Sequence, residues 1–254
     1  MVSTIPRVLL PTVQALAEDA AQRFARAASD AVQSHGAFVV ALSGGVTPRG
    51  LYERLAAPPY VSTVPWSLVQ VLWGDERCVA PDQAASNYRM TREALLDHVP
   101  IPAEHVHRIR GEDIPTEAAL AYERTLRAVL RTPQGPPRDT PGARIDLVLL
   151  GLGDDGHTAS LFPGASEVAD GEPWVAARYH VAGALWRVTL TPVLINAAAE
   201  VLFLVSGEAK AAIVRRVLEG PRRPQELPAQ LIAPAGGRLL WLLDAAAAGD
   251  LEGR

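Results

Sequence analysis

The sequence predicts an α/β fold of three layers, αβα, built on a mostly parallel, Rossmann-like sheet. Short, continuously apolar runs alternate with helix-like stretches along nearly the whole chain, which is typical of parallel strands covered by helices on both faces. Glycines and polar residues follow directly after several of these runs, at the strand ends beyond which such sheets bind ligands. We expect one domain over residues 1–254.

The elements of the N-terminal half follow from apolar periodicity. Val13–Val32 has Ala, Leu and Phe at helical spacing. Ala37–Leu42 and Val69–Trp73 are short apolar runs that predict buried strands. Pro48–Leu55 is predicted to be a helix because proline is favoured in a first turn, and Asn87–Leu96 is predicted to be another.

The C-terminal half continues the alternation. Thr116–Leu130 is predicted to be an amphipathic helix with Thr116 as its N-cap, and Thr132–Ala143 is predicted to be a surface loop. The remaining predicted elements are the strands Leu147–Leu150, Val188–Leu190, Val201–Val205 and Leu239–Leu243 and the helix Glu208–Leu218.

The composition argues against several classes of partner. The 254 residues carry a formal net charge of −4 and 48% of them are hydrophobic, so a sizeable core is expected but no overall positive field for nucleic acid or an anionic membrane. The N-terminus lacks a signal-peptide pattern, and no apolar run approaches the ~20 residues that span a bilayer. The single cysteine, Cys78, fits a reducing compartment. We therefore expect a cytoplasmic monomer or small homo-oligomer without nucleic-acid or membrane partners.

The first glycine-rich segment is Ser43-Gly44-Gly45-Val46-Thr47-Pro48, directly after a predicted strand. Glycines let the backbone approach a ligand, and the N-terminus of the following helix offers free N–H groups, a combination that binds phosphate. The alternative is an ordinary strand-to-helix turn. The segment matches neither GxGxxG nor a Walker loop with its lysine, which argues against a dinucleotide or a triphosphate.

Three cations are candidates for anion binding. Asp75-Glu76-Arg77 is either a solvated turn with a local ion pair, or a site at which Arg77 holds a phosphate and a carboxylate lies near the reacting centre. Arg187 opens the run RVTLT, and Lys210 falls in the first turn of a predicted helix. Each alone has the character of a surface charge, but their shared placement at strand ends favours one anionic ligand. Cys78 has no catalytic partner near it in sequence, so we interpret it as structural.

The strongest motif runs from Gly151 to Pro163 and contains His157. A histidine on a glycine-rich strand end can lie at a cleft with little steric cost, and imidazole titrates near neutral pH, which suits a general base. A lone histidine is more often structural, and Asp154, Asp155 and His157 together also suggest a metal site. No second histidine or cysteine stands at ligand spacing, so we expect no metal. His105 and His107 would share one face of a strand but have no third partner.

Six segments, in this order along the chain, carry a resemblance to a known family: Ala41–Pro48, Trp73–Arg77, Ser86–Tyr88, Gly153–Pro163, Arg187–Thr191 and Ser206–Lys210. Together they resemble the 6-phosphogluconolactonase family, which shares the glucosamine-6-phosphate isomerase and ribose-5-phosphate isomerase type of fold. The likeness covers nearly the whole chain, and its most specific string is GDDGHTASLFP.

The resemblance implies a reaction and a site. The implied reaction is the metal-independent hydrolysis of 6-phospho-D-glucono-1,5-lactone to 6-phosphogluconate in the oxidative pentose phosphate pathway, without a cofactor. His157 is then the catalytic base, and Asp75 lies beside the reacting centre, where it either takes the proton itself or only orients. The implied phosphate-binding residues are Ser43, Gly44, Gly45, Arg77, Arg187 and Lys210.

Two other functions stay open on the sequence. An isomerase or deaminase of amino-sugar phosphates would use the same scaffold, but its relatives typically have Asp-Glu-Tyr where this chain has Asp75-Glu76-Arg77. A non-catalytic sugar-phosphate sensor would keep the phosphate cluster and dispense with the base. The presence of His157 and an N-terminal helix without a basic face argue against a sensor.

Overall fold

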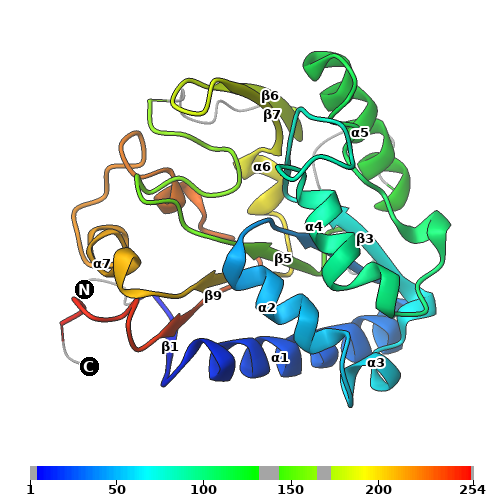
Figure 1. Ribbon diagram of the computed structural model, residues 1–254, viewed down its shortest axis with the longest axis horizontal. Helices are drawn as coiled ribbons and strands as arrows, with labels where there is room; N and C mark the ends of the chain where they lie inside the picture. Colours follow the sequence, from blue (N-terminus) through cyan, green and yellow to red (C-terminus); the bar gives the residue numbers. More distant parts are fainter. Residues whose placement is uncertain (1–4, 132–142, 165–172, 253–254) are drawn as a thin grey trace.

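The computed structural model describes residues 5–131, 143–164 and 173–252, and its centre is a six-stranded sheet. The strand order is β1-β9-β8-β5-β2-β3, and every neighbouring pair runs parallel. Helices flank this sheet (Figure 1), which confirms the predicted α/β class with a mostly parallel sheet. The strands are β1 (Arg7–Leu10), β2 (Phe38–Leu42), β3 (Val69–Trp73), β5 (Leu147–Leu150), β8 (Glu200–Val205) and β9 (Arg238–Asp244).

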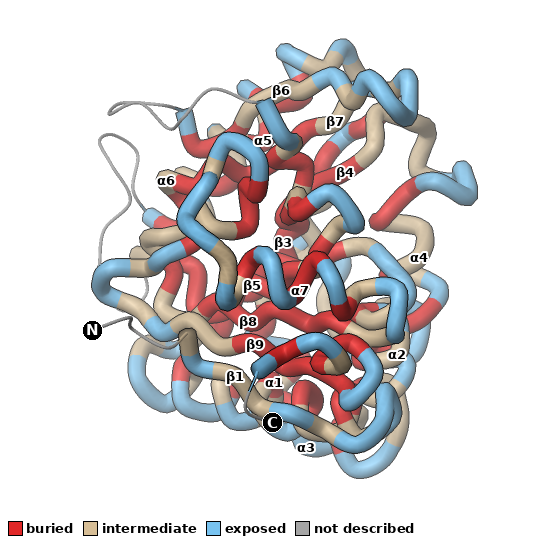
Figure 2. Tube along the Cα trace, turned by 90° about the vertical axis from the view of Figure 1, so that its left-hand side faces the viewer, coloured by how far each residue is buried: buried red, intermediate tan, exposed pale blue. Residues whose placement is uncertain are grey.

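The middle strands form the core. Strand β2 is buried along its whole length. Strand β5 is also buried throughout, as is all of β8 except its first residue (Figure 2). Burial on both faces explains why these segments are continuously apolar and do not alternate with polar residues. Between β8 and β9, the rings of Phe203 and Trp241 stack with their centroids 3.8 Å apart.

Helix boundaries follow local capping chemistry. The Oγ1 of Thr12 accepts a hydrogen bond from the Ala15 N–H at the start of α1, and Gly36 ends α1 with φ 87°, a conformation that glycine adopts without strain. Ser86 caps the start of α4 in the same way as Thr12. The α-helices in the described part of the chain are α1 (Val13–His35), α2 (Val46–Leu55), α3 (Tyr60–Thr63), α4 (Asn87–Ala94), α5 (Pro115–Val129), α6 (Pro192–Ile195) and α7 (Ala211–Leu218).

A second, antiparallel sheet that the sequence does not predict stands beside the first. Its order is β4 (Asp75–Arg77), β7 (Leu185–Leu190) and β6 (Val175–His180). The predicted strand Val188–Leu190 is the second half of β7, but it lies in this sheet and not in the parallel one. Strands β6 and β7 lie with α5 at the end of the molecule opposite α1 (Figures 1 and 2).

Some local predictions are wrong. Helix α5 begins at Pro115, so Thr116 is not its N-cap. His105 ends a short 3₁₀ helix instead of lying on a strand with His107. Lys210 does lie in the first turn of the predicted helical segment Glu208–Leu218, but this turn is a 3₁₀ helix, Glu208–Lys210, that leads directly into α7. Residues 132–142 of the predicted loop lie outside the described residues. Within the described residues, no helix has the length and apolar character needed to span a membrane.

Candidate active site

A cavity of about 500 Å³ opens at the carboxyl ends of the parallel strands. Its walls come from the segments that follow β2, β3, β5 and β8, which meet at one edge because these strands are parallel neighbours. The cavity brings together seven of the eight predicted site residues: Ser43, Gly44, Gly45, Asp75, Arg77, His157 and Lys210. The eighth, Arg187, is not on the cavity wall but pairs in register with Arg77.

The loop after β2 is fixed by hydrogen bonds to the side chain of Tyr52, a residue of α2. The Tyr52 hydroxyl donates to the Ser43 carbonyl at 2.7 Å and accepts from the Ser43 N–H at 3.0 Å. Burial raises the pKa of Tyr52 well above its usual range, so this hydroxyl stays protonated. The Oγ of Ser43 is itself buried without a partner in the described structure.

Glycine is required at position 44 by a close approach. A Cβ on Gly44 would lie 1.8 Å from Oδ1 of Asn87, a buried residue of α4 that also lines the cavity. Further along the loop, the hydroxyls of Thr47 and Ser206 lie 2.7 Å apart. This contact joins the start of α2 to the end of β8 across the cavity.

Asp75 is buried, with 8% of its surface exposed, and both of its carboxylate oxygens accept hydrogen bonds. Ser160 Oγ donates to Oδ2 at 2.6 Å, and Asn87 Nδ2 contacts Oδ1 at 3.3 Å. A carboxylate held at both oxygens is fixed in position. This arrangement favours an orienting or polarising role for Asp75 over proton transfer.

His157 is coupled to Asp155. Its Nδ1 lies 2.6 Å from Asp155 Oδ1, and its backbone N–H donates to the same oxygen at 3.0 Å. Burial raises the pKa of Asp155, but the hydrogen bonds and charge of His157 outweigh burial and leave the pKa of Asp155 below its ordinary value. An ionised carboxylate can only accept, so Nδ1 carries the proton and Nε2 is left as the basic nitrogen. A Cβ on Gly153 would lie 2.1 Å from His157 Nδ1, so glycine makes room for this ring.

Asp155 contacts the predicted base, whereas on the sequence alone it is only a possible metal ligand. The signal that identifies its role is its spacing: it stands two residues before His157 on a tight turn. At that separation a carboxylate reaches both the backbone and the ring of the histidine.

The cations of the site differ in how they are engaged. Lys210 Nζ contacts Asp154 Oδ1 at 2.5 Å, and Asp154 is largely exposed. Arg77 donates from Nη1 to the Ala85 carbonyl at 2.7 Å. Burial and the neighbouring charge of Arg77 lower the pKa of Arg187. A phosphate near Arg187 would relieve this repulsion.

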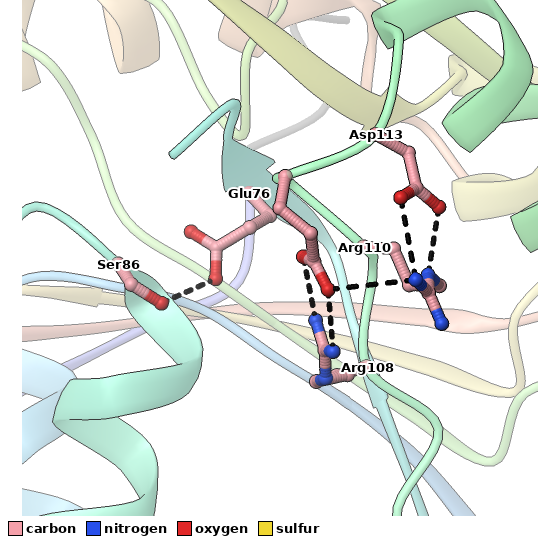
Figure 3. Close-up of polar contacts among 6 residues, drawn as sticks. Glu76, Ser86, Arg108, Arg110 and Asp113 are labelled. Carbon is pink, nitrogen blue, oxygen red and sulfur yellow. Dashed lines mark hydrogen bonds and ion pairs between the residues drawn. The ribbon is translucent and has the colours of Figure 1, made fainter. Parts of the chain in front are cut away.

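Glu76 anchors the corner that carries Asp75 and Arg77. It is 2% exposed, and its carboxylate accepts hydrogen bonds from Ser86 Oγ (Figure 3) and from the backbone N–H groups of Arg77, Asn87 and Tyr88. Burial raises the pKa of Glu76, although these hydrogen bonds oppose the effect. The carboxylate therefore ties β4 to the start of α4.

Two arginines near Glu76 (Figure 3), Arg108 and Arg110, form ion pairs with acidic side chains. Arg108 is paired with Glu112. Arg110 is paired with Asp113, as Figure 3 shows. Each pair is bidentate, so a carboxylate already neutralises the charge of each guanidinium group and occupies two of its N–H donors. Arg108 and Arg110 are therefore poor candidates for binding an anionic ligand.

The surroundings of His107 and Cys78, two further candidates from the sequence, favour structural roles. His107 Nε2 lies 2.7 Å from Gln70 Oε1. Burial raises the pKa of Cys78 to about 11, so its thiol is a poor nucleophile at neutral pH. Among the residues that the structure describes, no group of three or more His, Cys, Asp or Glu side chains is placed to hold a metal ion.

Comparisons with known proteins agree with the fold and the motifs. Residues 11–241 match the family model for glucosamine-6-phosphate isomerases/6-phosphogluconolactonase. A 6-phosphogluconolactonase of Nostoc sp. is 39% identical over 234 residues, which cover 87% of this chain and 88% of the relative. The solved 6-phosphogluconolactonase from Trypanosoma cruzi superposes with a TM-score of 0.85 at 27% identity, over 99% of this chain and 98% of that one.

A more distant structure shares the fold. A monomeric glucosamine-6-phosphate deaminase superposes with a TM-score of 0.79 at 21% identity, over 97% of this chain and all of the other. The resemblance predicted from the six sequence segments is confirmed by the family match and the curated relative. The chain belongs to the glucosamine-6-phosphate isomerase/6-phosphogluconolactonase family.

Proposed function

We propose that the protein hydrolyses 6-phospho-D-glucono-1,5-lactone to 6-phosphogluconate, the lactonase step of the oxidative pentose phosphate pathway. The observation that carries this proposal is His157, which is hydrogen-bonded to Asp155 and lines the same cavity as the glycine loop and the cations Arg77 and Lys210. A general base, a buried carboxylate and a phosphate site at one cavity are what hydrolysis of a phosphorylated lactone requires.

His157 acts as the base through Nε2. It takes a proton from a water molecule that attacks the lactone carbonyl, and it returns the proton to the ring oxygen as the ester bond breaks. Asp155 holds the tautomer that leaves Nε2 free and stabilises the imidazolium that forms. General-base catalysis of this kind contributes roughly 10²–10⁴-fold to the rate.

The phosphate end of the substrate provides orientation. The backbone of Gly44 and Gly45 and the Oγ of Ser43, which has no partner in the described structure, are available to bind the phosphate. Arg77 and Lys210 also line the cavity, and Arg187 reinforces Arg77. Lys210 exchanges Asp154 for the phosphate, which costs little because Asp154 returns to water. Binding energy from this remote group holds the carbonyl in place for attack.

Two observations support the lactonase over a deaminase or isomerase on the same scaffold. The curated relatives with the higher identity are named 6-phosphogluconolactonases, whereas the similar deaminase structure is only 21% identical. In addition, Arg77 on the cavity wall is a cation where the amino-sugar enzymes typically have a tyrosine.

The direct test is acid release from freshly generated 6-phosphogluconolactone. Purified protein should release acid at a rate far above the spontaneous hydrolysis measured in parallel, and should not deaminate glucosamine 6-phosphate. Acid release equal to the spontaneous background would reject the proposed function, and ammonia release from glucosamine 6-phosphate would favour the deaminase.

A further inference from the structure

Three arginines lie side by side across the second sheet. Arg77 of β4 pairs with Arg187 of β7, and Arg187 pairs with Arg178 of β6, both in direct cross-strand register. Directly opposite residues of antiparallel strands have Cβ atoms about 4.5–5.5 Å apart on one face, where like charges destabilise the sheet. We call Arg77, Arg187 and Arg178 the arginine row.

The arginine row forms no ion pair with a carboxylate in the described part of the chain, although the charges of Asp75 and Glu76 attract Arg187 from a longer distance. None of its three guanidinium groups forms an ion pair with a described carboxylate, and the acidic side chains around the cavity are bound elsewhere: Asp75 by Ser160, Glu76 by Ser86, Asp155 by His157 and Asp154 by Lys210. The Nε of Arg178 is buried and has no hydrogen-bond partner. A buried donor without a partner, beside an unpaired cation, indicates a binding place for an anion.

The row leads outward from the cavity. Arg77 lines the cavity wall, whereas Arg187 and Arg178 lie beyond it. His180 follows Arg178 on the same face of β6, and its ring stacks on Phe162, with centroids 4.2 Å apart and planes inclined by 10°. Phe162 in turn lies 5.1 Å from the ring of His157. His180, two residues after Arg178 on β6, therefore lies near His157, with the two ring centroids 6.4 Å apart.

The charge at this outer end comes from arginine alone. Burial lowers the pKa of His180, and the charges of Arg187 and His157 lower it further, so His180 is neutral at neutral pH. A neutral imidazole beside two guanidinium groups adds a hydrogen-bonding group without adding repulsion.

We propose that Arg178 and Arg187 form an outer phosphate-binding subsite, at which the dianionic group of the substrate is held as it enters the cavity. Guanidinium groups bind phosphate oxygens through paired hydrogen bonds. Two adjacent guanidinium groups carry two positive charges, so they suit a dianionic phosphate better than they suit a monoanionic carboxylate. The chain has a net charge of −4, so a local row of cations supplies the attraction that the whole protein does not. This inference rests on the proposed function and adds a capture step to it.

The test compares Arg178→Gln and Arg178→Glu with the control Arg124→Gln, which removes the same charge from the exposed side of α5. At low ionic strength, Arg178→Gln should lower kcat/KM by about tenfold with kcat unchanged, because only capture of the phosphate is lost. Arg178→Glu should lower it further, and both should flatten the dependence of kcat/KM on salt. The Arg124→Gln variant should behave as wild type.

Inorganic phosphate provides a second measurement that does not depend on turnover. Calorimetric titration should show weaker phosphate binding to Arg178→Gln than to wild type and to Arg124→Gln. Equal phosphate binding and equal salt dependence in wild type and Arg178→Gln would overturn the subsite. A fall in kcat with unchanged phosphate binding would overturn it too, because that result marks a structural effect. If wild type releases no acid above background, the proposed function fails, and the titration still decides whether the subsite exists.

Discussion

The site has a base side, which lies on the cavity wall, and a cation side, which extends along the arginine row beyond the cavity, and the two hold their polar groups in opposite ways. On the base side, Asp75 and His157 are each fixed by a neighbouring side chain, Ser160 and Asp155. On the cation side, Arg187 and Arg178 have no carboxylate partner among the described residues. Groups that are already oriented act on a reacting carbonyl without rearrangement, whereas unpaired cations obtain their partner from the ligand. We therefore expect changes on the base side to lower kcat and changes on the cation side to raise KM.

The largest effect is expected for His157→Ala. Loss of the base should lower kcat by roughly 10²–10⁴-fold with a smaller effect on KM, measured as initial acid release corrected for spontaneous hydrolysis. Asp75→Asn should be milder, because both oxygens of Asp75 already serve as acceptors within the protein. A folded His157→Ala enzyme with near-wild-type turnover would move the base to Asp75.

The next effect is expected for Asp155→Asn, with Asp154→Asn as the matched control one residue away. An amide at position 155 no longer fixes the His157 tautomer or stabilises the imidazolium, so kcat should fall by about 10²-fold. The Asp154 side chain pairs with Lys210 and lies mostly in solvent, so its variant should keep kcat. Equal kcat losses in the two variants would show that the base side is not organised around Asp155.

A smaller effect, and mainly on KM, is expected for Arg77→Ala. Losing one charged hydrogen-bonding partner of the phosphate should raise KM by about tenfold or more and lower kcat modestly. The control is Arg110→Ala, since Arg110 is engaged by Asp113 (Figure 3). If Arg77→Ala keeps the wild-type preference for the phosphorylated over the unphosphorylated lactone, Arg77 does not bind the phosphate of the substrate.

No effect is expected from chelators. The described residues contain no cluster of metal-ligating side chains, and the base side is complete with protein groups alone. Turnover measured before and after treatment with EDTA should be equal. Loss of turnover in EDTA that zinc restores would replace the base mechanism by metal activation of water.

The parallel sheet was predictable from the sequence and the antiparallel sheet was not. Strands β3 and β5 have the predicted boundaries because burial on both faces leaves an unbroken apolar run. Strand β4, in contrast, is Asp75-Glu76-Arg77, whose charges are typical of a turn. It is a strand only because β7, more than a hundred residues later, pairs with it. The sequence around Asp75–Arg77 contains no pattern that indicates pairing with so distant a strand.

The same reason limits what the sequence says about the site. His157 was identifiable because it stands in a specific motif, and the loop Ser43–Gly45 because glycines after a strand have a direct physical meaning. No sequence motif indicates a binding role for Arg178, because the proposed role depends on its cross-strand pairing with Arg187. The sequence contains Ser86-Asn87-Tyr88 as a motif, but only the structure places Asn87 between Asp75 and Gly44.

The buried carboxylate of Glu76 has a consequence for how this corner of the molecule opens. The first turn of a helix usually finds its hydrogen-bond partners locally, but the N–H groups of Asn87 and Tyr88 donate to Glu76 on β4. Separation of β4 from β7 therefore releases the start of α4 as well, and the two should open as one cooperative unit. Hydrogen exchange at the amides of Asn87 and Tyr88 should show the same protection as the amides that join β4 to β7.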